Sequence, residues 1–254
     1  MSSGTIGARE MGIHILGLAG LPEVRQGDNL AEMIGAAARA ENHPLGEGVV
    51  VVVAQKVISK AEGAVIDLRE VEASPAARRW ARHWGKDARL VEVILRQTRR
   101  VVKADRGIWI AETNHGWVTA NAGVDQSNAP DRDTVTVLPA DPDASARRLL
   151  EALGCGAVII TDTFGRPWRE GLLNVAIGVA GLEPLADYRG EPDRLGRPLQ
   201  STVIALADEL AAAAGLVMQK TAGIPVALIY GLEWKAAPGS ARPLIRPREH
   251  DLFR

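Results

Sequence analysis

The stretch GEGVVVVVAQKVIS, residues 46–59, contains five consecutive valines followed by Ala54 and a polar segment. Valine is β-branched and favours strands. A half-buried strand alternates apolar and polar residues, and this run does not alternate. It therefore predicts a strand buried on both faces, with Lys56, Ser59 and Lys60 in the segment that follows its carboxyl end.

Further strands and helices are predicted on both sides of this run. Periodicity and capping predict helices at 30–41 (capped by Asp28 or Asn29), 74–85, 88–102, 141–154 and 201–220. The basic stretch 96–103 is interpreted as a solvated helix face. Apolar runs predict strands at 12–18, 133–139 and 223–232, a strand from Cys155 that becomes a loop after Ile160, and a hairpin of 107–113 with 116–123. Because strands and helices mix without strict alternation, the sequence predicts an α+β (mixed α/β) fold.

The bulk composition is that of a globular protein without a polyanionic partner. The chain has 254 residues, 46% of them hydrophobic, and a net charge of −1, which argues against nucleic-acid and membrane binding. We expect a loose leader at 1–11 and a single unit at 12–254, with room for two closely packed subdomains. No signal-peptide pattern or long apolar run is present, so a cytoplasmic location is expected. The single cysteine, Cys155, is expected to be an inert core thiol.

The common motifs of nucleotide and hydrolytic enzymes are missing. The sequence contains no GxxxxGK[ST] loop, no GxGxxG after a strand, no HExxH and no GxSxG. Candidate chemistry therefore rests on polar segments at strand ends.

Two of these segments contain aspartate next to neutral oxygen donors. In TANAGVDQSN, Asp125 and Asn128 suit a hard cation such as Mg²⁺ or Mn²⁺, although an Asx-turn explains the same residues. In IITDTFGRPWREG, Asp162 and Thr163 suit a cation, and Arg166 and Arg169 suit phosphate or carboxylate oxygens; a solvated polar loop is the alternative.

Six motifs, in order along the chain, resemble the coenzyme F420-0:L-glutamate ligase family (γ-glutamyl ligases). They are GLPEVRQGDNL, VVVAQKVISKAEG, HGWVTANAGVDQSN, TDTFGRPWREGLLNVAIGVAGLEPLADYRG, DELAAAAGLVMQK and GIPVALIYGL. The resemblance implies a mixed α/β fold that forms an intertwined homodimer. It also implies a GTP-dependent enzyme that joins L-glutamate through an amide bond to F420-0 or F420-1, with Mg²⁺ or Mn²⁺, and with K⁺ as a further cation.

The same resemblance assigns roles to individual positions. It places the divalent cations on Asp125, Asp162 and Thr163, the two aspartates being the expected catalytic residues. It lines the nucleotide site with Leu21, Pro22, Glu23, Val24, Gln55, Lys60, Asn128, Met218, Gln219 and Lys220. The chain departs from the family pattern at Gln55-Lys56, where Ser-Thr or Ser-Lys is frequent, and at Gln219-Lys220, where Gly-Gln or Gly-Lys is frequent.

Two rival functions stay open: a metal-dependent nucleotide phosphohydrolase and a non-catalytic nucleotide-binding module. All three interpretations require Asp125 and Asp162, 37 positions apart in the chain, to lie close together in the fold.

Overall fold

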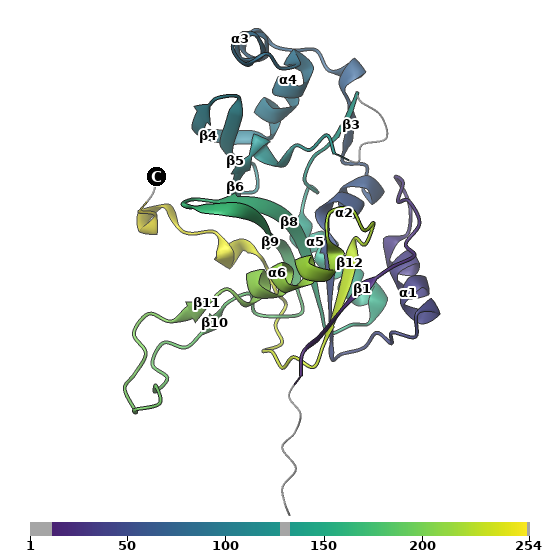
Figure 1. Cartoon of the computed structure of the whole chain (residues 1–254), viewed down its shortest axis with the longest axis vertical. Coiled ribbons are helices and arrows are strands. Elements are labelled where there is room, and N and C mark those ends of the chain that lie inside the picture. The colour runs from purple at the N-terminus through teal and green to yellow at the C-terminus, as the bar shows by residue number, and fades with distance from the viewer. Residues whose placement is uncertain (1–11, 128–132, 253–254) are drawn as a thin grey trace, which may run out of the picture.

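A five-stranded sheet in the order β1-β12-β2-β8-β9 forms the centre of the molecule (Figure 1). The computed structural model describes residues 12–127 and 133–252. The valine run forms β2 in the middle of this sheet, parallel to β8, while the other pairs are antiparallel. The bounds of the five strands are His14–Leu18 (β1), Val49–Ala54 (β2), Ala157–Arg166 (β8), Arg169–Ala180 (β9) and Val226–Tyr230 (β12).

Helices cover both faces of this sheet, as the valine run predicts. Val51 and Val53 face a core shared with α1 and α5, whereas Val50 and Val52 face a core shared with α6 (Figure 1). The helices span Leu30–Ala40 (α1), Gln55–Ala61 (α2), Pro142–Leu153 (α5) and Leu206–Met218 (α6). Asn29 caps α1 by accepting the Glu32 amide N–H, and Asp141 caps α5. The mixed α/β prediction is therefore confirmed.

A second, smaller core lies above the central sheet in Figure 1. It combines two helices, α3 and α4, with the three-stranded sheet β4-β5-β6 and with β3, which pairs with β7. Trp80, Trp84 and Trp109 pack together there, with ring centroids 4.5–5.4 Å apart. The bounds are Val65–Asp67 (β3), Pro75–Trp84 (α3), Ala88–Gln97 (α4), Thr98–Asp105 (β4), Ile108–Thr113 (β5), Val118–Ala120 (β6) and Thr134–Thr136 (β7).

Three sequence predictions are wrong in their bounds. The helix predicted to 102 ends at Gln97, because residues 98–105 alternate in exposure and pair with β5, so the basic stretch lies mainly on a strand. The loop predicted after Ile160 is a continuation of β8, whose polar residues pair with β9. The last long helix begins at Leu206 rather than 201, since the preceding residues form β11, Val203–Ile204, which pairs with β10, Ala186–Asp187.

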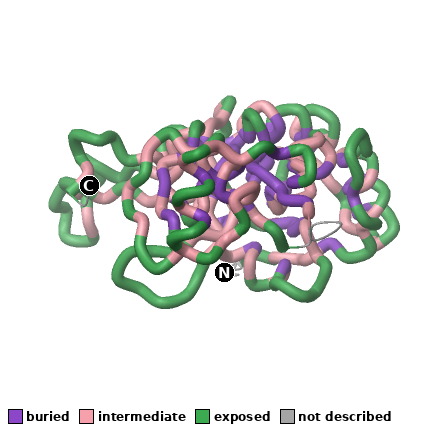
Figure 2. The backbone as a smooth tube through the Cα atoms, turned by 90° about the horizontal axis from the view of Figure 1, so that it is seen from above, coloured by how far each residue is buried: buried purple, intermediate pink, exposed green. Residues whose placement is uncertain are grey.

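The buried residues concentrate in the middle of the molecule, and the ends and projecting arms are exposed (Figure 2). Cys155 is buried, and burial raises the pKa of its thiol to about 11, as expected of an inert core cysteine. In the described parts of the chain, no helix combines the length and apolar character needed to cross a lipid bilayer.

Candidate active site

The topology of the central sheet brings the predicted site segments to one edge. β2 and β8 are parallel, and Ala54 pairs with Thr161, so Lys56 and Asp162 follow neighbouring strand positions. Leu18 at the end of β1 pairs with Val226 at the start of β12. The segment after β1 and the segment between α6 and β12 therefore reach the same edge as the ends of β2 and β8.

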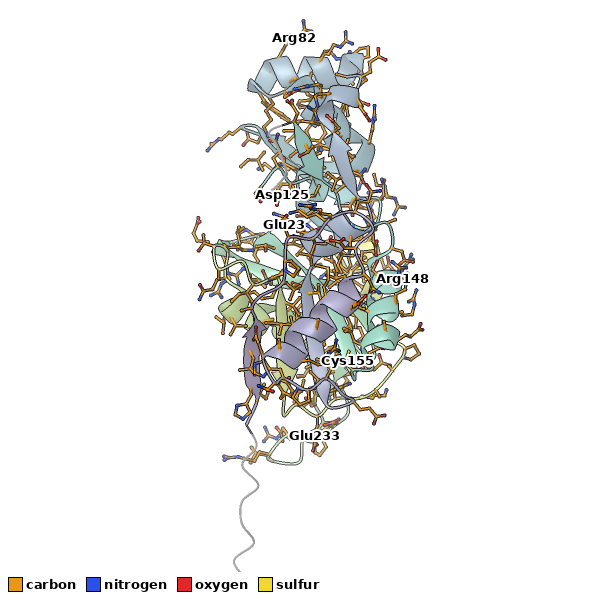
Figure 3. All side chains as sticks on the ribbon, turned by 90° about the vertical axis from the view of Figure 1, so that its right-hand side faces the viewer. Glu23, Arg82, Asp125, Arg148, Cys155 and Glu233 are labelled. Carbon is orange, nitrogen blue, oxygen red and sulfur yellow. The ribbon has the colours of Figure 1, made fainter. Side chains whose placement is uncertain are left out.

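Asp125 reaches this edge from the smaller core and meets Lys56 there. The Asp125 carboxylate lies 2.8 Å from Lys56 Nζ and accepts the Ser127 amide N–H and hydroxyl at 2.6 and 2.9 Å. Burial acts to raise the pKa of Asp125, but the bonds from Lys56 and Ser127 outweigh it and hold that pKa below its usual range. Asp125 is therefore a carboxylate with a lysine partner. Figure 3 shows it where the two parts of the molecule meet.

The backbone before Asp125 is unusual. Asn121 and Ala122 both have φ of 52°, and Gly123 has φ of 74°. Left-handed conformation costs a non-glycine residue roughly 1–2 kcal/mol. Backbone strain of this kind concentrates at functional sites, where the surrounding structure holds it in place.

Asp162 lies on β8 within electrostatic reach of Asp125. Burial raises the pKa of Asp162 to about 6, and the Asp125 charge adds to the rise, while the Thr163 amide N–H, Lys220 and Lys56 oppose it. The next residue, Thr163, donates its hydroxyl to Asn174 at 3.0 Å and accepts a hydrogen bond from Lys220. The two aspartates that the sequence analysis required to be close are thus near each other.

These donors suit a hard divalent cation. Within the described residues no group of three or more His, Cys, Asp or Glu side chains converges on one point. The oxygen donors near one another are the Asp125 and Asp162 carboxylates, and the Thr163 hydroxyl lies on the residue next to Asp162. Mg²⁺ is commonly held by one or two carboxylates, with the remaining positions taken by water and substrate phosphates. A partly buried carboxyl whose pKa is raised beside a second carboxylate is a place where a cation would relieve repulsion.

The segments assigned to the nucleotide meet through an ion pair. Lys60 Nζ lies 2.5 Å from Glu23 Oε1, so the largely buried lysine joins α2 to the segment after β1. Gln55 is buried, and its side-chain oxygen accepts the Ser59 hydroxyl at 2.8 Å. Pro22 and Glu23 are exposed, whereas Val24 belongs to the core.

The end of α6 supplies the remaining assigned residues. Met218 is buried in the core that packs against α6. Gln219 has φ of 49° and ψ of −176°. That conformation is favoured almost only by glycine.

Two predicted substrate residues lie elsewhere, and one lies outside the described residues. Arg166 and Arg169 pair with each other at the tip of the β8–β9 hairpin and are exposed. Arg166 lies four strand positions beyond Asp162, about 13 Å along β8. Within this chain, Arg166 therefore does not converge on the carboxylates. Asn128 falls in the undescribed range 128–132.

The sequence motifs assign no role to Ser127 or Asn174, although both contact the site residues directly. Ser127 bonds Asp125 and accepts from Lys56 Nζ at 2.7 Å, and Asn174 orients Thr163 from the neighbouring strand. Ser127 lies in the same polar motif as Asp125, which is a local signal. Asn174 becomes a candidate only through the pairing of β8 with β9.

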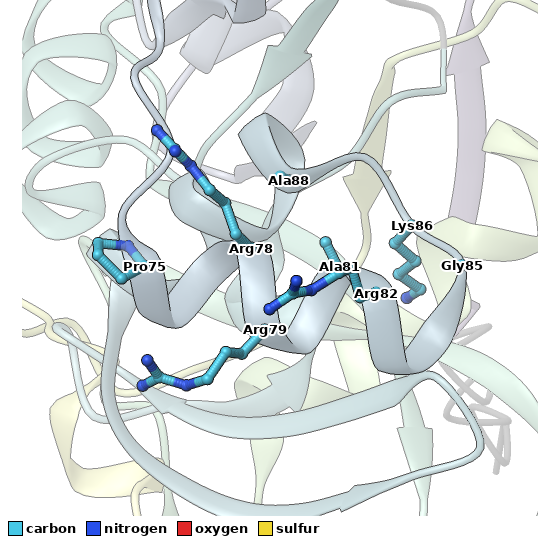
Figure 4. A pocket seen from close by; sticks show the side chains of 8 residues that line it. All are labelled: Pro75, Arg78, Arg79, Ala81, Arg82, Gly85, Lys86 and Ala88. Carbon is cyan, nitrogen blue, oxygen red and sulfur yellow. The ribbon is translucent and has the colours of Figure 1, made fainter.

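A separate hollow lies on α3, and Figure 4 shows its lining. It carries Arg78, Arg79, Arg82 and Lys86 and contains no carboxylate. Figure 3 shows Arg82 at the far end of the molecule from the sheet edge, well above Asp125. This hollow is not part of the carboxylate site.

The fold and the site together define a class of protein: a mixed α/β protein with paired aspartates and lysines at one sheet edge, suited to anionic, oxygen-rich small molecules. The model of the F420-0:Gamma-glutamyl ligase family matches residues 20–231. The chain belongs to this family.

Curated relatives match nearly the whole chain. A coenzyme F420:L-glutamate ligase of Methanothermobacter thermautotrophicus is 46% identical over 252 residues, covering 96% of this chain and 100% of the relative. The protein of that name from Methanopyrus kandleri is 50% identical over 242 residues, covering 91% and 94%. The one from Methanocaldococcus jannaschii is 41% identical over 250 residues, covering 95% and 97%.

Proposed function

We propose that this protein is a GTP-dependent ligase that adds L-glutamate to coenzyme F420-0 or F420-1 through an amide bond. The observation that carries the proposal is the meeting of Asp125 and Asp162 with Lys56 and Lys220 at one sheet edge. The near full-length similarity to proteins named coenzyme F420:L-glutamate ligase supports the choice of substrates.

The chemistry needs an activated carboxyl group, because a carboxylate does not react with an amine at neutral pH. A carboxylate oxygen of the acceptor attacks the γ-phosphorus of GTP, and the bond from that phosphorus to the bridging oxygen breaks to release GDP. The glutamate amine then attacks the acyl-phosphate carbon, phosphate leaves with the electron pair of the C–O bond, and the nitrogen loses its proton. Phosphoryl transfer of this kind depends mainly on alignment and charge neutralisation.

The chain offers residues for both tasks. Asp125, Asp162 and Thr163 would hold Mg²⁺ or Mn²⁺, with K⁺ as a further cation. A divalent ion at this place supplies positive charge to phosphate oxygens. Lys56 and Lys220 lie beside these oxygen donors and place positive charge where phosphate groups would lie. Lys60 contributes once Glu23 gives way to an anionic ligand.

The proposal includes a homodimer. Large apolar side chains are exposed on the two arms that project from the sheet, with Leu172 at 68% and Leu195 at 72% exposure. Figure 1 shows the β8–β9 hairpin and the β10–β11 arm extending on the same side of the molecule. Exposed apolar arms of this kind favour association with a second copy.

Phosphate release from GTP tests the function directly. In the presence of Mg²⁺ or Mn²⁺, a ligase releases phosphate only when both L-glutamate and F420-0 are present. Release without either co-substrate would instead support the phosphohydrolase, and no release under any condition would support the binding module.

A variant tests the role of the carboxylates. Asp125→Ala is expected to lower turnover by at least about 10²–10³-fold, since it removes a group that organises charge at the reacting phosphate. Asp105→Ala, at an exposed position on β4, is the matched control and should leave turnover unchanged. Wild-type turnover in Asp125→Ala would refute the assignment.

A further inference from the structure

A small pocket adjoins the carboxylate site. It has a volume of about 220 Å³. Its lining comes from the β5–β6 turn, the β8–β9 hairpin, α6 and the segment near the C-terminus: Gly116, Trp117, Val118, Phe164, Val175, Ala176, Asp208, Leu244, Ile245 and Arg246. Sites for drug-sized ligands span roughly 300–1,000 Å³. A pocket of this size suits a single amino acid better than a drug-sized or larger ligand.

The strand register places this pocket next to Asp162. Val175 pairs directly with Asp162, and directly paired residues project from the same face of a sheet. Phe164 follows Asp162 by two positions, so it shares that face at a spacing of about 7 Å. The pocket wall is therefore one side-chain spacing from the candidate cation site.

The polar groups of the pocket carry opposite charges. One oxygen of Asp208 accepts the Ala176 amide N–H at 2.9 Å, and the other has no hydrogen-bond partner among the described residues. Arg246 is exposed and lines the same pocket. Within the described ranges neither group forms an ion pair, with the other or with any third residue. A carboxylate and a guanidinium that line one pocket, together with Trp117 and Phe164, complement a zwitterion.

We propose that this pocket binds the L-glutamate co-substrate, with Asp208 holding its amino group and Arg246 one of its carboxylates. The inference rests on the proposed ligase function and deepens it. Trp117 and Phe164 add aromatic faces, which attract an ammonium group. The amino acid would then lie beside the site where the acceptor carboxyl group is activated.

Steady-state kinetics of Asp208→Asn and Arg246→Gln test the proposal. Asparagine keeps the oxygen that accepts the Ala176 N–H but loses the charge, and Arg246 lies on an exposed segment, so both variants should fold. Each should raise the KM for L-glutamate about tenfold or more and leave the KM for GTP unchanged. Glu209→Gln and Arg248→Gln remove equivalent exposed charges nearby and should change neither constant.

The outcomes separate this proposal from the ligase function. Wild-type ligation with an unchanged glutamate KM in both variants would overturn the pocket assignment alone. A joint rise of both KM values would show a structural role and would overturn it too. Calorimetric binding of L-glutamate gives a readout independent of turnover: the wild type should bind and both variants should bind more weakly. Absence of binding to the wild type would end the proposal.

Discussion

The surroundings of Asp162 disfavour the ionised form of its carboxyl group. Its pKa is raised to about 6 by burial and by Asp125. An aspartate in the unfolded chain has a pKa near 3.9. Because the folded-state pKa of Asp162 is higher, the free energy of unfolding falls as the pH rises from the unfolded-state pKa to the folded-state pKa. Below both values the group is protonated in either state and contributes no penalty. At pH 8 the full penalty is present.

Asp162→Asn should therefore stabilise the metal-free protein at pH 8. The expected gain is about 2 kcal/mol, allowing for the partial exposure of the side chain. Urea unfolding in the presence of a chelator measures it. The gain should vanish near pH 4, and added Mn²⁺ should stabilise the wild type but not the variant. A variant less stable than the wild type at pH 8 would contradict this account.

At the level of elements, the β8–β9 hairpin carries Asp162, Thr163 and Asn174, and its position depends on a glycine. A β carbon at Gly178 would lie 2.5 Å from the Pro142 carbonyl oxygen, because β9 runs directly beneath the start of α5. Nearby, the pairing of β8 with β9 shifts register between Ile160 and Thr161. This shift precedes the strand positions of Asp162 and Thr163.

Gly178→Ala should destabilise the protein by about 1–3 kcal/mol, the usual cost of overpacking. It should also reduce ligation, since the strand that faces Asp162 must move. Gly165→Ala is the control on the same hairpin, because its nearest neighbour, a Leu172 methyl, lies 3.6 Å away. Thermal unfolding compares the two. Equal melting temperatures would show that β9 and α5 separate at no cost.

For the whole molecule, two projecting arms leave large apolar side chains exposed. Leu172 lies on β9 near the hairpin tip, and Leu195 lies in the loop between β10 and β11. Isolated exposed leucines are common, but two on neighbouring arms suggest a shared interface.

Leu172→Asp combined with Leu195→Asp should convert the proposed dimer into a monomer. Placing charge in an apolar interface costs several kcal/mol per group. Sedimentation velocity at micromolar concentration measures the change, and Leu216→Asp, on exposed α6 surface, serves as a comparison. A wild-type protein that sediments as a monomer would refute the dimer.

Much of the fold follows from local sequence. The valine run, the caps at Asn29 and Asp141, and the glycine that ends α5 act through neighbouring residues. Such short-range preferences are therefore visible without a structure. The mixed α/β class and the polar motifs at strand ends follow from the same kind of information.

Only the tertiary structure decided which distant residues meet. The polar residues around Asp162 predict a loop, yet they form part of β8. The pairing with β9 supplies the backbone hydrogen bonds of this strand, and its partly exposed side chains can be polar, so the sequence there lacks the apolar pattern of a strand. The approach of Asp125 to Asp162, the Lys60–Glu23 pair and the pocket that Asp208 and Arg246 line join segments up to 130 residues apart in the chain. Contacts between residues so far apart in the chain depend on the topology of the whole fold, which local sequence preferences do not specify.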